Sequence, residues 1–223
     1  TDETRHYLNG IYLHKKSLEN KTFLCGVATD SHRLSSSSIE IDSNNEIDSI
    51  ILPKKTIFQL ISLLEQSNQA IKISNNKSKI KFEMESGVLI SKVIDGRFPD
   101  YDKVIPKNND KILEIKLSEF KNSIERVTTV SSDRKEGLKM LISKDSIELT
   151  VNNPNSGEGA EKISAKFNSE DLTISFNSRY LTDIASHIEN ETILIYFKDP
   201  GSPVLIIDPL DKNSFHVVMP MKI

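Results

Sequence analysis

One pattern of a strand, a helix and then several strands occurs three times along the 223 residues, and it limits the fold more than any other feature. Each copy opens with a short apolar run and continues into a stripe of apolar residues at helical spacing. Each copy then ends in runs where apolar and polar residues largely alternate. Two such units in tandem predict one domain with antiparallel sheets and both helices on one side. The predicted fold class is therefore α+β.

The first copy begins with a strand over 49–52, and Pro53 suits the first turn of the helix that follows. The apolar stripe of this helix consists of Ile57, Leu60, Ile61 and Leu64. Asn75-Asn76 and Ser86-Gly87 are typical of turns, so they divide the rest of the copy into strands. We expect these strands over 70–74, 79–83 and 88–93.

The second copy contains a strand over 112–116 and a helix for which Ser118 is the expected N-cap. The inward positions of this helix are Phe120, Ile124 and Val127, and its strands follow over 137–143, 146–151 and 161–167. In the third copy, a strand over 172–176 leads to a helix capped by Asn177 or Ser178. The helix turns Leu181, Ile184, Ala185 and Ile188 inward, and its strands are expected over 192–197, 204–208 and 215–219.

The repeats predict two domains, over residues 1–108 and 109–223. Copies two and three form the second domain. Copy one is preceded by three expected strands, over 5–13, 23–29 and 34–41, without a strand and helix of their own. We therefore expect the first domain to be truncated at its N-terminus. The segment 99–110, with two prolines, Asn108-Asn109 and many charges, is predicted to be the linker.

The composition is that of a globular protein, with 37% hydrophobic and 27% charged residues. A net charge of -3 excludes a generally basic protein that coats nucleic acid, so any DNA contact is confined to one face. The single cysteine, Cys25, cannot form an intrachain disulfide, which suits a reducing compartment and predicts the cytoplasm. No apolar run approaches 18 residues, so no membrane partner is expected.

Catalytic chemistry is harder to find. Asp30, Ser31 and His32 bring an acid, a hydroxyl and a histidine together, but adjacent residues in a turn rarely point at one another. The five histidines lack metal-ligand spacing, and the chain has no glycine-rich phosphate loop or nucleophile elbow. We expect neither a cofactor nor a catalytic residue, and a hydrolase that uses His32 and Asp30 is the remote alternative.

The helices carry cations away from their core faces, while most acidic residues lie in strands and turns. A fold with its helices on one side would gather these cations on one surface, where they could contact phosphates without reading bases. The plain alternative is that surface helices often carry lysine, and Glu65, Glu119 and Glu125 dilute the bias. The cations concerned are Lys54, Lys55, Lys121, Arg126 and Arg179.

The chain ends in an apolar run over 217–223, where most chains end in a solvated tail. The plain prediction is a buried final strand in the core. The alternative is a surface for apolar partners, because the flexible side chains of Met219 and Met221 adapt to different shapes.

Four segments, at 5–10, 27–34, 95–101 and 217–221, together resemble the bacterial DNA polymerase III beta subunit family of sliding clamps. With the triple repeat, the resemblance extends over essentially the whole chain, as the second and third domains of a three-domain subunit. It implies a head-to-tail homodimer that closes a ring around duplex DNA, with helices lining the hole and sheets outside. Such a ring holds replication proteins on DNA and catalyses nothing.

The resemblance also implies an apolar pocket between the two domains. There the polymerase catalytic subunit, the clamp loader and repair proteins dock short motifs with Leu or Phe anchors. Ser31 stands where the family often has Gly, Lys103 where Arg is common, and Lys135 where the enterobacterial form has an aromatic residue, so peptide preference is expected to differ. The implied pocket residues are Leu8, Thr29, His32, Arg33, Leu34, Pro99, Lys103, Val104, Asn177, Tyr180, Pro203, Val204, Val217, Val218, Met219, Pro220 and Met221.

The resemblance places Lys54 and Lys55 at helix positions that face DNA. It also places Arg5, His6 and Tyr7 in a loop near the strand that contacts the template. It further places Thr129 and Val130 near one of the two surfaces that together form the subunit interface. The alternative from another class is a peptide-binding scaffold module of similar fold without a DNA role.

Overall fold

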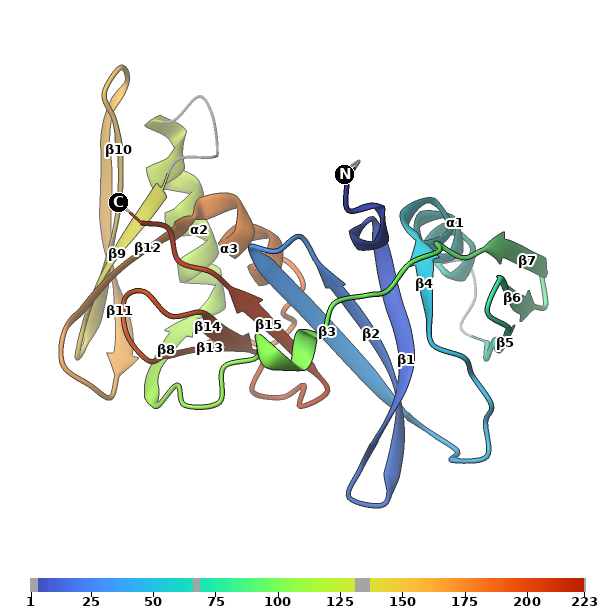
Figure 1. The fold of residues 1–223 in the computed structure, drawn as a ribbon. Helices are drawn as coiled ribbons and strands as arrows, with labels where there is room; N and C mark the ends of the chain where they lie inside the picture. The colour runs from blue at the N-terminus through green and yellow to red at the C-terminus, as the bar shows by residue number, and fades with distance from the viewer. Residues whose placement is uncertain (1–3, 66–68, 131–136, 223) are drawn as a thin grey trace. The chain divides into compact units, whose positions relative to one another are not determined.

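The computed structural model describes residues 4–65, 69–130 and 137–222. The chain divides into two compact units, one over 1–30 and 35–100 and the other over 31–34 and 101–223 (Figure 1). The short segment 31–34 therefore packs with the second unit, although it lies within the first half of the sequence. The predicted boundary between residues 108 and 109 stays a prediction. Lys135 and Ile223 lie outside the described residues.

Unit 2 is built from two copies of the repeat whose opening strands are exchanged. The strand order is β12-β9-β10-β11-β8-β13-β14-β15, with every neighbouring pair antiparallel. β8 opens the second copy and lies between β11 of that copy and β13 of the third copy, whereas β12, which opens the third copy, pairs with β9 of the second. The strands are β8 (Lys111–Lys116), β9 (Gly137–Ser143), β10 (Ser146–Asn153), β11 (Gly157–Phe167), β12 (Leu172–Asn177), β13 (Thr192–Phe197), β14 (Val204–Ile207) and β15 (Ser214–Val218).

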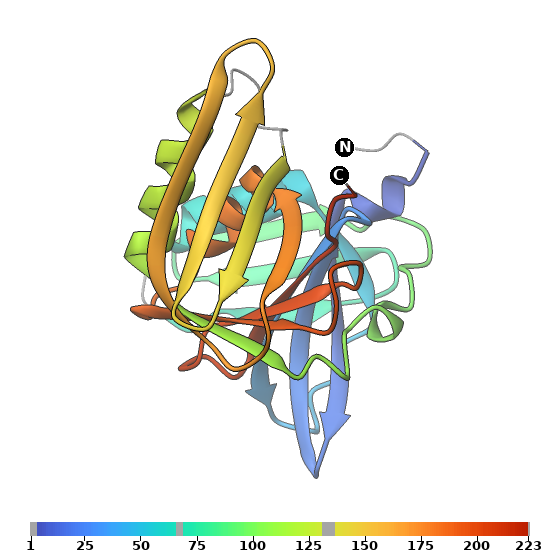
Figure 2. The same cartoon turned by 90° about the vertical axis from the view of Figure 1, so that its left-hand side faces the viewer.

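Two helices, α2 (Leu117–Val127) and α3 (Ser178–Ala185), contact each other, and α2 packs along β10 and β11 (Figure 2). The predicted inward residues Phe120, Ile124 and Val127 are buried, as are all four predicted for the third copy. This confirms the helical stripes, because one apolar face of each helix meets the alternating apolar residues of the strands. Ile188 is buried beyond the end of α3, just after the turn that follows the helix.

The two helix starts differ. Asn177 caps α3 as predicted, because its side-chain Oδ1 accepts a hydrogen bond from the backbone N–H of Arg179 at 3.0 Å. The prediction of Ser118 as the cap of α2 is wrong, since α2 starts at Leu117 and has no side-chain cap. The N–H of Leu117 instead donates to the backbone oxygen of Glu191 at 2.7 Å. A tertiary acceptor thus replaces the local cap.

The end of α2 lies close to β11 at Gly159. A Cβ atom at this position would be 2.5 Å from the backbone oxygen of Val127, so any other residue would force the helix and the strand apart. The chain continues from α2 into a 3₁₀ turn, η3 (Thr128–Val130), and Val130 packs against the same core.

Unit 1 contains the order β3-β2-β1-β4 and a separate three-stranded sheet β5-β6-β7. The predicted strand over 5–13 is wrong at its start, because residues 6–8 form a 3₁₀ turn, η1 (His6–Leu8), and the strand begins at Gly10. The elements are β1 (Gly10–Leu18), β2 (Lys21–Thr29), β3 (Arg33–Ile41), β4 (Ile50–Pro53), α1 (Lys54–Leu64), β5 (Lys72–Asn75), β6 (Lys79–Met84) and β7 (Gly87–Lys92).

The stripe predicted for α1 is only partly buried. Ile57 and Leu60 pack against a cluster that contains Ile80 and Phe82, but Ile61 is 47% exposed. Ile61, one of the four residues of the stripe, therefore lies largely outside the core. In the described part of unit 1, α1 is the sole α-helix, so no second helix covers its remaining apolar face. In unit 2, α2 and α3 cover each other.

Candidate functional site

Two of the four motif segments meet within unit 1. The ring atom Nε2 of His6 lies 3.0 Å from the backbone oxygen of Asp95. Gly96 has φ of +135°, and a Cβ there would be 3.2 Å from Cβ of Tyr7. Phe98 is buried and stacks on Tyr12, with ring centroids 4.9 Å apart. Segments 5–10 and 95–101 therefore form one local structure.

Residues 31–34 of the third motif segment meet the fourth segment within unit 2. The backbone N–H of Met219 donates to the backbone oxygen of His32 at 2.8 Å. The turn before β3 places Ser31 at φ +76°, in the left-handed region that favours glycine. This strain-prone conformation gives a physical reason for the Gly that the resemblance leads us to expect there in relatives.

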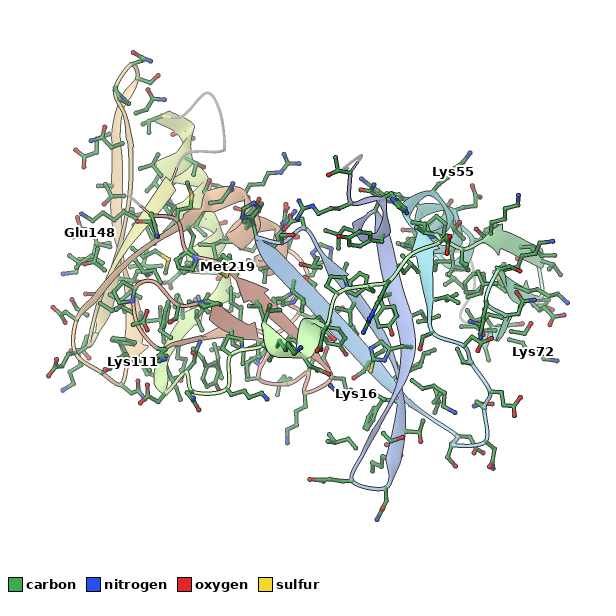
Figure 3. The ribbon with its side chains drawn as sticks, viewed as in Figure 1. Lys16, Lys55, Lys72, Lys111, Glu148 and Met219 are labelled. Atoms are coloured by element: carbon green, nitrogen blue, oxygen red, sulfur yellow. The ribbon has the colours of Figure 1, made fainter. Side chains whose placement is uncertain are left out.

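The terminal segment, residues 217–221, has a buried part and an exposed part. Val217 and Val218 are 3% and 0% exposed, and Val218 pairs with Val204 in the sheet. Met219 and Met221 are 40% and 38% exposed, although the N–H of Met221 donates to the backbone oxygen of Ser175 at 2.7 Å. The backbone is thus fixed at both methionines while their side chains reach solvent. Met219 is labelled in Figure 3.

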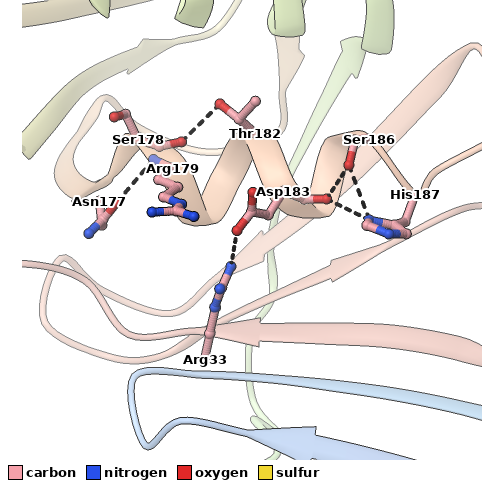
Figure 4. A network of polar contacts seen from close by, with 8 residues as sticks. All are labelled: Arg33, Asn177, Ser178, Arg179, Thr182, Asp183, Ser186 and His187. Atoms are coloured by element: carbon pink, nitrogen blue, oxygen red, sulfur yellow. Dashed lines mark hydrogen bonds and ion pairs between the residues drawn. The ribbon is translucent and has the colours of Figure 1, made fainter. Parts of the chain in front are cut away.

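Arg33 connects segment 31–34 to α3. Its Nη1 donates to Oδ2 of Asp183 at 2.7 Å (Figure 4). Its guanidinium carbon lies 4.4 Å from the centroid of the Tyr180 ring. Tyr180 and Asp183 are three residues apart on α3, so both side chains lie on one face of the helix. We call these three residues the Arg33 network.

The implied pocket residues differ in exposure. Leu34, Val204, Val217 and Val218 are buried, so they support the surface from within. His32, Lys103, Val104, Met219 and Met221 are exposed, and Arg33, Tyr180 and Pro203 are half-buried. The side chain of Asn177 is used as the cap of α3. Leu8, Thr29 and Pro99 belong to unit 1, and the others, Pro220 included, belong to unit 2.

The cations implied to face DNA differ in their availability to phosphate. Lys54 and Lys55 are exposed on the first turn of α1, with Nζ of Lys54 5.6 Å from the centroid of the Phe58 ring. The side chain of Lys55 is labelled in Figure 3. Arg179 is exposed on α3, and Lys121 is half-buried on α2. In unit 1, His6 is exposed, and Arg5 and Tyr7 are half-buried.

Arg126 is held by an acidic partner. Its Nε and Nη2 donate to the two carboxylate oxygens of Glu161 on β11, at 2.9 and 2.5 Å, and Nη2 also contacts Oγ of Ser123 at 3.2 Å. The hydrogen bond from Arg126 lowers the pKa of Glu161, and the same bond raises the pKa of Arg126. Much of this positive charge is therefore compensated by Glu161, which weakens the case for Arg126 as a phosphate contact.

Thr129 and Val130, the residues implied for the subunit interface, lie in η3. Thr129 is exposed, and its hydroxyl donates to the backbone oxygen of Arg126 at 2.7 Å. Val130 is half-buried against the core of unit 2. The interface role of both residues stays a prediction.

Within residues 4–65, 69–130 and 137–222, no group of three His, Cys, Asp or Glu side chains is arranged to hold a metal ion. The described helices include none with the length and apolar character needed to cross a membrane.

The two units correspond to two domains of one known family. The sequence model of the DNA polymerase III beta subunit, central domain, matches residues 1–100, and that of the C-terminal domain matches residues 102–222. The chain belongs to the DNA polymerase III beta subunit family. Its α+β fold and its strand-rich repeats are those of this family.

Several bacterial beta subunits in this family are similar over the whole chain. The beta sliding clamp of Caulobacter vibrioides (strain NA1000 / CB15N) is 37% identical over 100% of this chain and 60% of its own length. The beta sliding clamp of Escherichia coli (strain K12) is 30% identical over 99% of this chain and 59% of its own length. The chain thus spans about 60% of the relatives that it matches.

Solved beta subunit structures have the same fold. The crystal structure of the Caulobacter crescentus beta sliding clamp matches with a TM-score of 0.97 and 37% identity over 100% of this chain and 60% of that chain. A sliding clamp from Bartonella birtlesii, solved bound to griselimycin, matches with a TM-score of 0.95 and 38% identity over the same shares.

Three residues of the candidate site were not predicted from the sequence: Asp183, Glu161 and Ser175. Asp183 and Glu161 were overlooked because their arginine partners lie 150 and 35 residues away along the chain. Ser175 carries the one buried side-chain oxygen without a hydrogen-bond partner among the described residues, on the strand that receives Met221. The only available signal for Asp183 was its position three residues after Tyr180, an implied pocket residue, on a predicted helix.

Proposed function

We propose that this chain is part of a processivity factor of DNA replication, a sliding clamp. In the complete protein, a head-to-tail homodimer encircles duplex DNA and tethers replication proteins to it. The observation that carries this proposal is the match of both units to consecutive domains of one beta subunit family, with a TM-score of 0.97 to a beta sliding clamp. The chain acts as a non-catalytic subunit of a DNA polymerase holoenzyme in the cytoplasm.

DNA contacts in the proposed ring are weak and independent of base sequence. A topological tether needs no tight grip, since a strongly bound ring could not slide. Exposed lysines such as Lys54 and Lys55 suit this task better than a continuous basic patch would. The net charge of -3 agrees with contacts confined to one face.

Partner capture is assigned to the terminal segment and its surroundings. Met219 and Met221 offer exposed, adaptable apolar side chains on a backbone fixed by two hydrogen bonds. Short peptides with Leu or Phe anchors from the polymerase catalytic subunit, the clamp loader and repair proteins are the proposed ligands. A few such anchors give micromolar binding, about -8 kcal/mol, which permits exchange between partners.

The deciding experiment measures retention of the complete protein on DNA. The ring is loaded onto a nicked circular plasmid by the clamp loader and separated from free protein by gel filtration. We expect the protein to stay with circular DNA and to be lost once a restriction enzyme linearises the plasmid. Equal retention on both forms would contradict encirclement. No retention on either form, together with intact peptide binding, would favour the scaffold module without a DNA role.

A further inference from the structure

We propose that Asp183 is a positioning residue for the peptide-binding surface, acting through Arg33 on the backbone of Met219. The inference rests on the proposed capture of peptides by the terminal segment. Asp183 is not among the residues that the family resemblance implies for this surface, and nothing in its own position requires it to touch a peptide.

The argument starts at α3, whose position is fixed by the core. Leu181, Ile184 and Ala185 are 1%, 4% and 0% exposed, so the helix cannot shift without disturbing the core of unit 2. The side chains of Tyr180 and Asp183 leave this helix on the partly exposed side. Because α3 is fixed, the side chains of Tyr180 and Asp183 start from fixed backbone positions and form a rigid platform for the group that contacts them.

Arg33 makes two contacts with that platform at once. The ion pair with Asp183 at 2.7 Å fixes one end of the guanidinium group, and the Tyr180 ring at 4.4 Å supports its flat face. A planar guanidinium group with one edge and one face engaged has little rotational freedom left. Removing the charge of Asp183 would take away the ion pair that holds one end of this group against α3.

The next link is the backbone of segment 31–34. This segment includes Ser31 in the left-handed region, a conformation that depends on its surroundings for a residue other than glycine. Arg33 joins the segment to α3 by an ion pair and a ring contact. Holding Arg33 thus helps to hold the backbone oxygen of His32, the residue before it.

The last link is the terminal segment itself. The oxygen of His32 accepts the N–H of Met219 at 2.8 Å, at the point where β15 has ended. The path from α3 to the exposed Met219 side chain therefore consists of one ion pair, one ring contact, one turn and one backbone hydrogen bond. Figure 4 shows the first part of this path, with Arg33 reaching Asp183 on α3.

The test uses the full 223-residue chain with Met219 carrying a ¹³C-labelled ε-methyl group and an uncharged hexapeptide with Leu and Phe anchors as the probe. Asp183→Asn keeps the size of the side chain and removes its charge, and Asp183→Glu restores the charge. The matched control is Glu170→Gln, which removes one negative charge from an exposed turn between β11 and β12.

We expect Asp183→Asn to shift or broaden the Met219 methyl signal and to weaken peptide binding about two- to five-fold, the range for a partly exposed ion pair. Asp183→Glu should recover most of both effects, and Glu170→Gln should change neither. Salt at about 1 M should move the wild-type signal toward that of Asp183→Asn, because it screens the exposed pair. A merely structural role for Asp183 would lower the melting temperature without this recovery or salt response.

A Met219 signal that is the same in wild type and Asp183→Asn would overturn the inference, whatever the affinity. Failure of the wild-type chain to bind the peptide would instead overturn the proposed capture of partners. The methyl signal would then still decide whether Asp183 positions Met219. Should Asp183→Asn fail to fold, the salt response of the wild-type signal decides the inference by itself.

Discussion

At the scale of single residues, Met219 is central to the proposed capture of peptides by the terminal segment. Its side chain is 40% exposed while its N–H is bonded to His32, so it offers apolar surface at a fixed place. We predict that Met219→Ala weakens binding of a Leu- and Phe-anchored peptide about ten-fold, in proportion to the lost apolar contact. Isothermal titration calorimetry measures the dissociation constant.

The control is Leu210→Ala, which removes an 80% exposed apolar side chain before β15 and should leave affinity unchanged. Equal constants for Met219→Ala and wild type would remove Met219 from the binding surface.

A second residue on β15, His216, makes stability depend on pH. The pKa of His216 is lowered from 6.5 to about 4, chiefly by burial and also by the charge of His187, while Asp211 acts in the opposite direction. The unfolded chain takes up a proton near pH 6.5, whereas the folded chain does so only near pH 4. The free energy of unfolding must therefore fall as the pH drops through this interval, by about 3 kcal/mol at most.

The measurement is urea unfolding of wild type and His216→Gln at pH 7 and at about pH 4.5. We expect the variant to lose less stability than wild type on acidification, because it has no proton to take up at this position. Carboxylates with lowered pKa, such as Glu161, lose stabilising contacts below their ordinary values in both proteins and cancel in the difference. Parallel losses in the two proteins would show that His216 does not control this interval.

At the scale of elements, α1 carries the prediction for DNA. Lys54 and Lys55 are exposed in its first turn, whereas Arg126 on α2 is paired with Glu161. We predict that Lys54→Ala with Lys55→Ala slows loading of the complete protein onto DNA and lowers the slope of log affinity against log salt by about two. Circular dichroism should show an unchanged fold.

The matched control replaces Lys162 and Lys166 on β11 with Ala. Ile163, Ala165 and Phe167 of this strand are buried in the core, so the two lysines lie on its opposite face. The control removes the same charge but should leave loading and the salt slope unchanged. If both double variants slow loading equally, overall charge rather than the face of α1 determines the effect.

Helix ends show why sequence prediction of elements was uneven. Asn177 was identifiable because a capping side chain acts on its own neighbours along the chain. Ser118 was misleading because the N-terminus of α2 is satisfied by Glu191, which is distant in sequence. The strand over 5–13 was misjudged at its start for a similar reason, since the packing of Tyr7 against Gly96 belongs to the tertiary structure.

At the scale of the whole molecule, the sheets of the two units differ in how many apolar side chains they bury. The sheet β5-β6-β7 buries Ile80 and Phe82, and its edge strand β7 exposes Val88 and Ile90. The sheet of unit 2 closes over one continuous core that contains both helices. Local opening is easier where fewer apolar groups are buried.

We therefore predict that amide hydrogen exchange is slowest in β9, β10 and β13 and clearly faster in β5–β7. Exchange followed by mass spectrometry on the full chain measures this directly, with peptides from each strand compared at the same time points. Exchange in β6 as slow as that in β10 would mean that the small sheet is stabilised by contacts other than its own core.

The sequence by itself determined the repeat, the strands of unit 2, the inward faces of α2 and α3, and the family, because all of these follow from periodicity and local motifs. Only the tertiary structure decided that β8 pairs with β13, that 31–34 packs with unit 2, that Glu161 compensates Arg126, and that Asp183 holds Arg33. The physical reason is that apolar periodicity is repeated over many residues and can be read locally. A single ion pair or hydrogen bond joins residues far apart in the chain, and nothing in the order of residues marks its two ends.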